Sequence, residues 1–192
     1  MSVKKDNEIT VRVTCSDDEL IKTLSDKGFS EDVKFTISDY YMIPKDLKLD
    51  ELSTRDILSK AVIIRDFDDE GIRSQKITFK KKEINEKGEI LSQKATTCDV
   101  KDYKAAINLF NELNYYEIMN IEESDIVYQK NKTKLALKFI KGANTLIEIE
   151  ADEKYDTIEK LKQLVDDLGL PIEKDNYFVK KAEDELNKVL NR

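Results

Sequence analysis

Polar and apolar residues alternate in short stretches along much of the chain, beginning with NEITVRVT at residues 7–14. From Glu8 onward the even-numbered residues, Glu8, Thr10 and Arg12, are polar and the odd-numbered ones are apolar, so an extended strand would carry them on opposite faces. Seven further strands are predicted, at residues 33–43, 61–67, 75–84, 89–97, 125–132, 134–141 and 145–152.

Helical patterns with start and stop signals separate these strands. Ser16 can cap the first helix, Glu19 completes an S-x-x-E capping box, and Gly28 ends it. Asp99 is expected to cap the second helix. Helices are predicted at residues 16–28, 99–114, 156–169 and 176–190, with a helical turn inside the loop at residues 44–58. The element order is β, α, four β, α, three β, α, α, which predicts an α+β fold.

The polar face of several strands is charged. In one strand Glu148 and Glu150 alternate with Ile147 and Ile149. One architecture with this pattern is an open sheet that has helices on one face and water on the other, where the charges need no further role. Another is a closed barrel whose polar lumen must be neutralised by internal pairing or by a polyanion such as a triphosphate. The pattern alone favours the solvated sheet, because charges gathered on one face usually mean solvation.

The composition limits the classes of partner. The chain has 192 residues, which suits a single domain, and its 33 Lys and Arg against 40 Asp and Glu give a net charge of −7. This net negative charge disfavours non-specific electrostatic binding to nucleic acid or to an anionic membrane. The longest plain apolar run, residues 61–64, is too short to span a bilayer, and the first ten residues lack the apolar segment of a signal peptide. We therefore expect a cytoplasmic protein.

Histidine is absent from the sequence, and Cys15 and Cys98 are isolated from each other without C-x-x-C spacing. These facts exclude histidine metal sites, zinc thiolate sites and catalysis by Ser-His or Cys-His pairs. Carboxylates and the side chains of Lys and Arg are left as the candidate chemical groups.

Five short motifs resemble, in order along the chain, the signature strands of a known family. EITVR at residues 8–12 resembles ExExK, and KAVIIR at residues 60–65 resembles RxR. ITFK at residues 77–80, QKNK at residues 129–132 and LIEIE at residues 146–150 resemble LTYK, KxR and EIE. The signature strands that they resemble are those of the CYTH, or triphosphate tunnel metalloenzyme, family. This family includes class IV adenylyl cyclases, thiamine triphosphatases and inorganic triphosphatases. Because the resemblance covers almost the whole chain, it shifts the expectation to the closed barrel.

The resemblance implies an eight-stranded antiparallel closed barrel with helices packed outside, formed by a single CYTH-like domain over residues 1–192. The implied ligand is a nucleoside triphosphate, thiamine triphosphate or inorganic tripolyphosphate, and the implied reaction is a phosphohydrolase or cyclase reaction that needs Mg²⁺ or Mn²⁺. The basic positions carried over as phosphate-binding residues are Arg12, Arg65, Lys80, Lys130 and Lys132. The acidic positions carried over as metal ligands are Glu8, Glu148 and Glu150. No catalytic residue is assigned, nucleic acid and membrane partners are not expected, and a homodimer is left open.

Several positions depart from the family pattern. Thr10 replaces the second Glu of ExExK, Ile63 replaces the first Arg of RxR, and Lys138 falls on the position of a metal-ligating Asp. A lysine there would repel a metal ion and could pair with phosphate instead. Three hypotheses stay open: a metal-dependent triphosphate enzyme, a CYTH-like module that binds a nucleotide or polyphosphate without turnover, and an interaction protein whose charges are only solvated.

Overall fold

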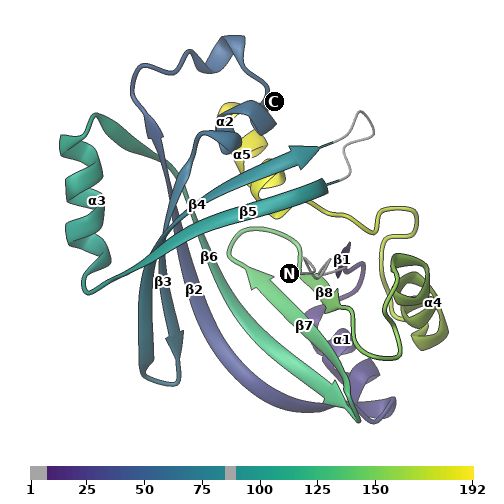
Figure 1. Ribbon diagram of the computed structural model, residues 1–192. Coiled ribbons are helices and arrows are strands. Elements are labelled where there is room, and N and C mark those ends of the chain that lie inside the picture. Colours follow the sequence, from purple (N-terminus) through teal and green to yellow (C-terminus); the bar gives the residue numbers. More distant parts are fainter. Residues whose placement is uncertain (1–7, 85–89) are drawn as a thin grey trace. The chain divides into compact units, whose positions relative to one another are not determined.

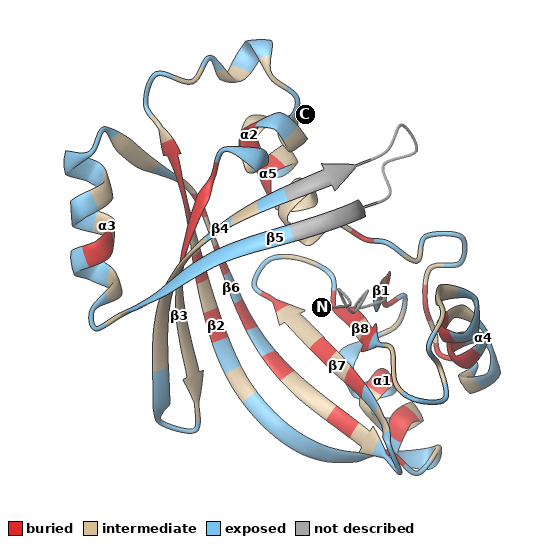
Figure 2. Cartoon of the chain, viewed as in Figure 1, coloured by how far each residue is buried: buried red, intermediate tan, exposed pale blue. Residues whose placement is uncertain are grey.

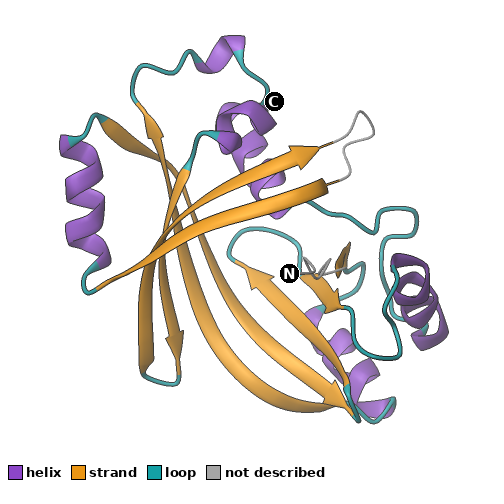
Figure 3. Ribbon diagram, in the orientation of Figure 1, coloured by secondary structure: helices purple, strands orange, loops and turns teal. Residues whose placement is uncertain are grey.

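The computed structural model describes the backbone of residues 8–84 and 90–192, and their side chains except at residues 82–84 and 90–93 (Figures 1 and 3). Residues 7 and 89, where two strands were predicted to begin, lie outside the described residues. The helices are α1 (Asp17–Asp26), η1 (Leu49–Glu51, a 3-10 turn), α2 (Thr54–Ser59), α3 (Tyr103–Glu112), α4 (Ile158–Leu168) and α5 (Lys181–Leu190). None of these helices of the described chain is long and apolar enough to cross a membrane.

The strands are β1 (Glu8–Arg12), β2 (Ser30–Pro44), β3 (Val62–Asp69), β4 (Ile72–Ile84), β5 (Ile90–Val100), β6 (Tyr115–Lys130), β7 (Thr133–Ile140) and β8 (Leu146–Glu150). They form one sheet in the order β1-β8-β7-β6-β2-β3-β4-β5. The neighbouring pairs β1–β8, β8–β7, β7–β6, β2–β3, β3–β4 and β4–β5 are all antiparallel. This confirms an α+β chain with eight antiparallel strands. Hydrogen bonds between described residues do not join the terminal strands β1 and β5, so closure of the barrel stays a prediction.

The chain divides into two compact units. The first unit comprises Met1–Phe35 and Glu123–Lys180, and the second comprises Thr36–Glu122 and Lys181–Arg192. Strands β2 and β6 each contribute residues to both units. A single CYTH-like domain over residues 1–192 stays a prediction.

In the first unit, one face of the strands packs against α1 and α4. Figure 2 shows buried positions recurring along β7 and β8. As predicted, the hydroxyl of Ser16 caps α1 by accepting a hydrogen bond from the backbone N–H of Glu19. The apolar face and the two helices supply the core residues Ile9, Val11, Leu20, Leu24, Leu135, Leu137, Ile147, Ile149, Leu161, Leu164 and Val165. The opposite face of these strands is therefore the one that carries charge.

In the second unit, α3 covers a smaller apolar cluster. Ala106 of α3 packs with Met42 of β2 and Ile64 of β3, and Tyr40 of β2 stacks on Tyr103 with ring centroids 5.2 Å apart. At another place in this unit α2 contacts α5, where the guanidinium of Arg55 donates to both carboxylate oxygens of Glu183. These contacts fix the helices that accompany β2, β3 and β4.

The start of α3 differs from the prediction. Asp99 lies opposite Lys76 in the ladder of β4 and β5, which continues to Val100. The helix begins at Tyr103, and the side chain of Asp102 accepts hydrogen bonds from the backbone of its first turn. The sequence offers two aspartates three positions apart, and strand pairing, which is not local, decides which of them becomes the cap.

Two other boundaries show larger differences. Strand β6 begins at Tyr115, whereas the sequence predicted residue 125. The first half of β6 was missed because it places apolar Ile118 beside apolar Met119 and so lacks a period of two. Helix α5 begins at Lys181 rather than at residue 176. The preceding segment instead runs along β1, where the backbone N–H and C=O of Thr10 bond to residues 177 and 179 at 3.0 Å each.

Ile149→Asp is expected to lower the free energy of unfolding by about 3 kcal/mol or more, because it buries a carboxylate without a cationic partner. Ile149 is 1% exposed in the core of the first unit. Ile72→Asp is the matched control, since Ile72 is 75% exposed, and it should change stability by about 0.5 kcal/mol or less. Urea unfolding of both variants provides the measurement. Equal losses in the two variants would mean that this face of β8 is not buried.

Candidate functional site

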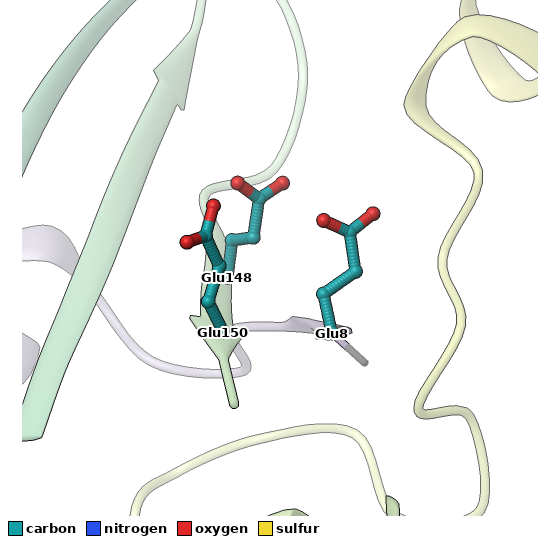
Figure 4. A group of neighbouring side chains, drawn as sticks. All are labelled: Glu8, Glu148 and Glu150. Atoms are coloured by element: carbon teal, nitrogen blue, oxygen red, sulfur yellow. The ribbon is translucent and has the colours of Figure 1, made fainter. Parts of the chain in front are cut away.

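Three glutamates lie together on the charged face of the first unit. Strands β1 and β8 pair so that Glu8 lies opposite Glu150 and Thr10 lies opposite Glu148. Figure 4 shows the side chains of Glu8, Glu148 and Glu150 leaving the two strands toward the same side. One carboxylate oxygen from each of them lies within 4.8 Å of the others. The structure thus brings together all three residues predicted as metal ligands.

The chemistry of this group suits a small divalent cation. Mg²⁺ and Mn²⁺ prefer carboxylate oxygens and keep several water ligands, so two or three carboxylates on a partly open surface are sufficient. In an octahedral Mg²⁺ site, neighbouring ligand oxygens are about 3 Å apart and opposite ones about 4.2 Å apart. The three oxygens here lie within 4.8 Å of one another, so the side chains would have to close in on a bound ion by about 1–2 Å. Glu8 and Glu150 are exposed and Glu148 is half-buried, which leaves room for water.

Lys138 of β7 lies beside this group and is held by carboxylates. Its ammonium donates to Oδ2 of Asp125 at 3.1 Å and lies 3.5 Å from Oε1 of Glu148. Asp125 is the direct partner of Lys138 in the β6–β7 ladder and is completely buried. Burial by itself lowers the pKa of Lys138, but the charges of Glu148 and Asp125 outweigh it and raise that pKa to about 12. The side chain is therefore a permanent cation near neutral pH.

Two acidic residues of β6 were missed by the sequence prediction. Asp125 and Glu123 are both buried on the charged side of β6, and both raise the pKa of Lys138. Their spacing of two residues is the signal that could have indicated a shared face. It was hidden because Glu122 and Ser124 make the stretch continuously polar, and because the predicted strand began only at residue 125.

Arg12 of β1 lies on the same face as Glu8 and is tied to the segment after α4. Its Nη1 donates to Oε2 of Glu173 at 3.1 Å, and its backbone C=O accepts from the N–H of Glu173 at 2.8 Å. Both side chains are partly exposed, so the ion pair is screened by water and can open.

Lys130 and Lys132, predicted as phosphate ligands, are not brought to the three glutamates. Lys130 is five residues from Asp125 along β6, so it points to the opposite face, and its ammonium donates to the backbone C=O of Lys27 at 2.6 Å. Lys132 lies in the turn between β6 and β7 and pairs with Glu153, both side chains being more than 80% exposed.

The other two predicted phosphate ligands, Arg65 and Lys80, lie in the second unit. Arg65 of β3 makes a bidentate ion pair with Asp39 of β2, with both N–O distances 2.6 Å and the Asp39 side chain 2% exposed. Lys80 of β4 is half-buried, lies opposite Ala95 of β5, and shares a strand face with Thr78.

Comparison with known proteins supports the fold. No family model and no curated protein matches the chain. Among solved structures, the PH1819 protein of Pyrococcus horikoshii is 20% identical with a TM-score of 0.66, over 95% of this chain and 99% of its own. A candidate adenylate cyclase from Vibrio parahaemolyticus is 13% identical with a TM-score of 0.56, over 97% of this chain and 98% of its own. A candidate adenylyl cyclase from Hippeastrum, described as having a dominant triphosphatase activity, is 14% identical with a TM-score of 0.57, over 86% of this chain and 89% of its own. These likenesses support a CYTH-like fold.

Arg65→Met is expected to lower the free energy of unfolding by about 3 kcal/mol, because it leaves the buried carboxylate of Asp39 without its cation. Arg73→Met is the matched control in the same unit, since Arg73 is 62% exposed and pairs with Asp68 at the surface, where loss costs about 1 kcal/mol or less. Urea unfolding compares the two. A loss at Arg65 no larger than that at Arg73 would contradict a structural role for the Arg65–Asp39 pair.

Proposed function

We propose that the protein binds a triphosphate-containing ligand together with one Mg²⁺ or Mn²⁺ and acts on it as a phosphohydrolase or cyclase. The observation that carries the proposal is the convergence of Glu8, Glu148 and Glu150, whose oxygens fit a divalent cation. The fold adds support, since structures with the same fold include candidate adenylate cyclases and one protein with triphosphatase activity. The ligand class is a nucleoside triphosphate, thiamine triphosphate or inorganic tripolyphosphate.

The residues of the first unit suggest a division of roles. Glu8, Glu148 and Glu150 would hold the cation, and a bound divalent ion would supply positive charge that polarises a phosphate group. Lys138 keeps Glu148 in place through an ammonium contact of 3.5 Å. Arg12 can turn from Glu173 to an anionic ligand, because their ion pair is partly exposed.

The other four residues proposed to bind phosphate are supported to different degrees by their contacts. Lys80 is half-buried on a strand face, where a charge-assisted contact with phosphate would be stronger than in water. Arg65 would have to share its guanidinium between phosphate and Asp39. Lys130 and Lys132 would have to leave the partners they now contact, so their assignment has the least support.

A second candidate function is binding of a nucleotide or polyphosphate without turnover. The cation of Lys138 is the specific observation in its favour, because it stands where the family pattern has a metal-ligating Asp and engages Glu148, one of the three candidate ligands. A site with weak metal affinity could still attract a polyanion through its lysines and arginines.

Glu148→Gln is expected to weaken Mn²⁺ binding and to slow phosphate release from tripolyphosphate by about tenfold or more each, because the amide keeps the shape but not the charge. Glu153→Gln is the control, since Glu153 is 86% exposed and lies outside the group. Calorimetry measures Mn²⁺ affinity, and assays of released phosphate and pyrophosphate with ATP, thiamine triphosphate and tripolyphosphate measure turnover.

The same assays separate the two candidate functions. The enzyme is supported if the wild type releases phosphate or pyrophosphate from any of the three substrates and Glu148→Gln does not. If neither phosphate nor pyrophosphate is released from any of the three substrates, the proposed enzyme activity is excluded. Tripolyphosphate binding that persists with the metal chelated then supports the binding module.

A further inference from the structure

The ammonium of Lys138 occupies a cage of carboxylates drawn from both neighbouring strands. Asp125 of β6 contributes Oδ2 at 3.1 Å, and Glu148 of β8 contributes Oε1 at 3.5 Å. Glu123, two residues before Asp125, adds a third negative charge that acts on the same ammonium. Asp125 is 0% exposed and Glu123 is 4% exposed, and the side chain of Lys138 is only 13% exposed. The cage is thus built into the unit and is not a chance contact of surface side chains.

The cage and the group of three glutamates share one residue. Glu148 lies 3.5 Å from the Lys138 ammonium, and its carboxylate also belongs to the group with Glu8 and Glu150. A charge placed beside a shared carboxylate competes with any second cation that approaches it. Lys138 therefore acts electrostatically on every cation that the glutamates bind.

We propose that Lys138 is a positioning residue that serves as a tethered, resident cation and restricts this face of the first unit to a single divalent ion. The ammonium fills the place between Asp125 and Glu148 that a second ion would otherwise take, and it weakens the hold of the three glutamates on the first. The inference rests on the proposed function in one respect, namely that Glu148 is a metal ligand.

A purely structural role for Lys138 predicts something different. If the lysine only neutralises buried carboxylates, its removal destabilises the fold but creates no new affinity for a divalent ion. The number of ions bound per chain therefore separates the two roles, and stability alone does not.

The test is Lys138→Met in the full chain, which removes the charge and keeps an unbranched side chain of similar length. Mn²⁺ binding is followed by calorimetry and by electron paramagnetic resonance, which counts free ion. We expect one Mn²⁺ per chain for the wild type and two for the variant. Lys134→Met is the matched control on the same strand, since Lys134 is 57% exposed and pairs with Asp32, and it should keep the wild-type number.

The number of Mn²⁺ ions bound per chain also distinguishes a failure of this inference from a failure of the proposed function. A rise from one Mn²⁺ in the wild type to two in Lys138→Met supports the resident cation. A wild type that binds none removes the metal site of the proposed function and, with it, the restriction to a single ion. An unchanged count overturns the resident cation and leaves the metal site of the proposed function standing if the wild type binds one ion.

A second variant covers the case in which Lys138→Met does not fold. Lys138→Met combined with Asp125→Asn removes both charges of the closest pair and still releases Glu148. It should bind Mn²⁺ about fivefold or more tightly than the wild type, in line with the usual range of coupling between sites. Equal binding in the double variant and the wild type would overturn the proposal.

Discussion

A carboxylate that is removed from water must be paired with a cation, and this requirement governs the charged strands of both units. Asp125 in the first unit and Asp39 in the second are almost completely buried. Each is paired across a strand ladder, Asp125 with Lys138 and Asp39 with Arg65. These two ion pairs commit Lys138 and Arg65 to stabilising the fold.

The ion pairs of Lys138 influence the candidate metal site. Its ammonium sits between Asp125 and Glu148, so one of the three clustered glutamates is oriented by a cation from its neighbouring strand. Glu8 and Glu150 are at the exposed side of the group, where an ion could enter with its water ligands. The same arrangement suits a metal-dependent enzyme and a binding module, because both would need cations that neutralise the negative charge of a polyphosphate.

Much of the fold could be predicted from local pattern. The period of two in NEITVRVT and LIEIE placed Ile9 and Ile149 in the core and Glu8 and Glu150 on the other face, because strand alternation depends only on neighbouring residues. The capping role of Ser16 was predicted for the same reason. The resemblance of five motifs then indicated which charged positions would converge, and the three glutamates do so.

The parts that could not be predicted depend on pairing between distant segments. The register of β6 against β7 sets Asp125 opposite Lys138, and no local signal contains that register. The phase of β6 likewise turns Lys130 to the helix-covered face, although its motif resembled a phosphate-binding strand. Asp102 rather than Asp99 caps α3 because the β4–β5 ladder extends through Asp99.

Anomalous diffraction from crystals soaked with Mn²⁺ and tripolyphosphate tests the central claim most directly. It locates the ion relative to the two groups of carboxylates that share Glu148. A single manganese peak among Glu8, Glu148 and Glu150, with the Lys138 ammonium still between Asp125 and Glu148, is the predicted result. A peak among Asp125, Glu123 and Glu148 with Lys138 displaced, or no peak on this face of the first unit, would contradict the account.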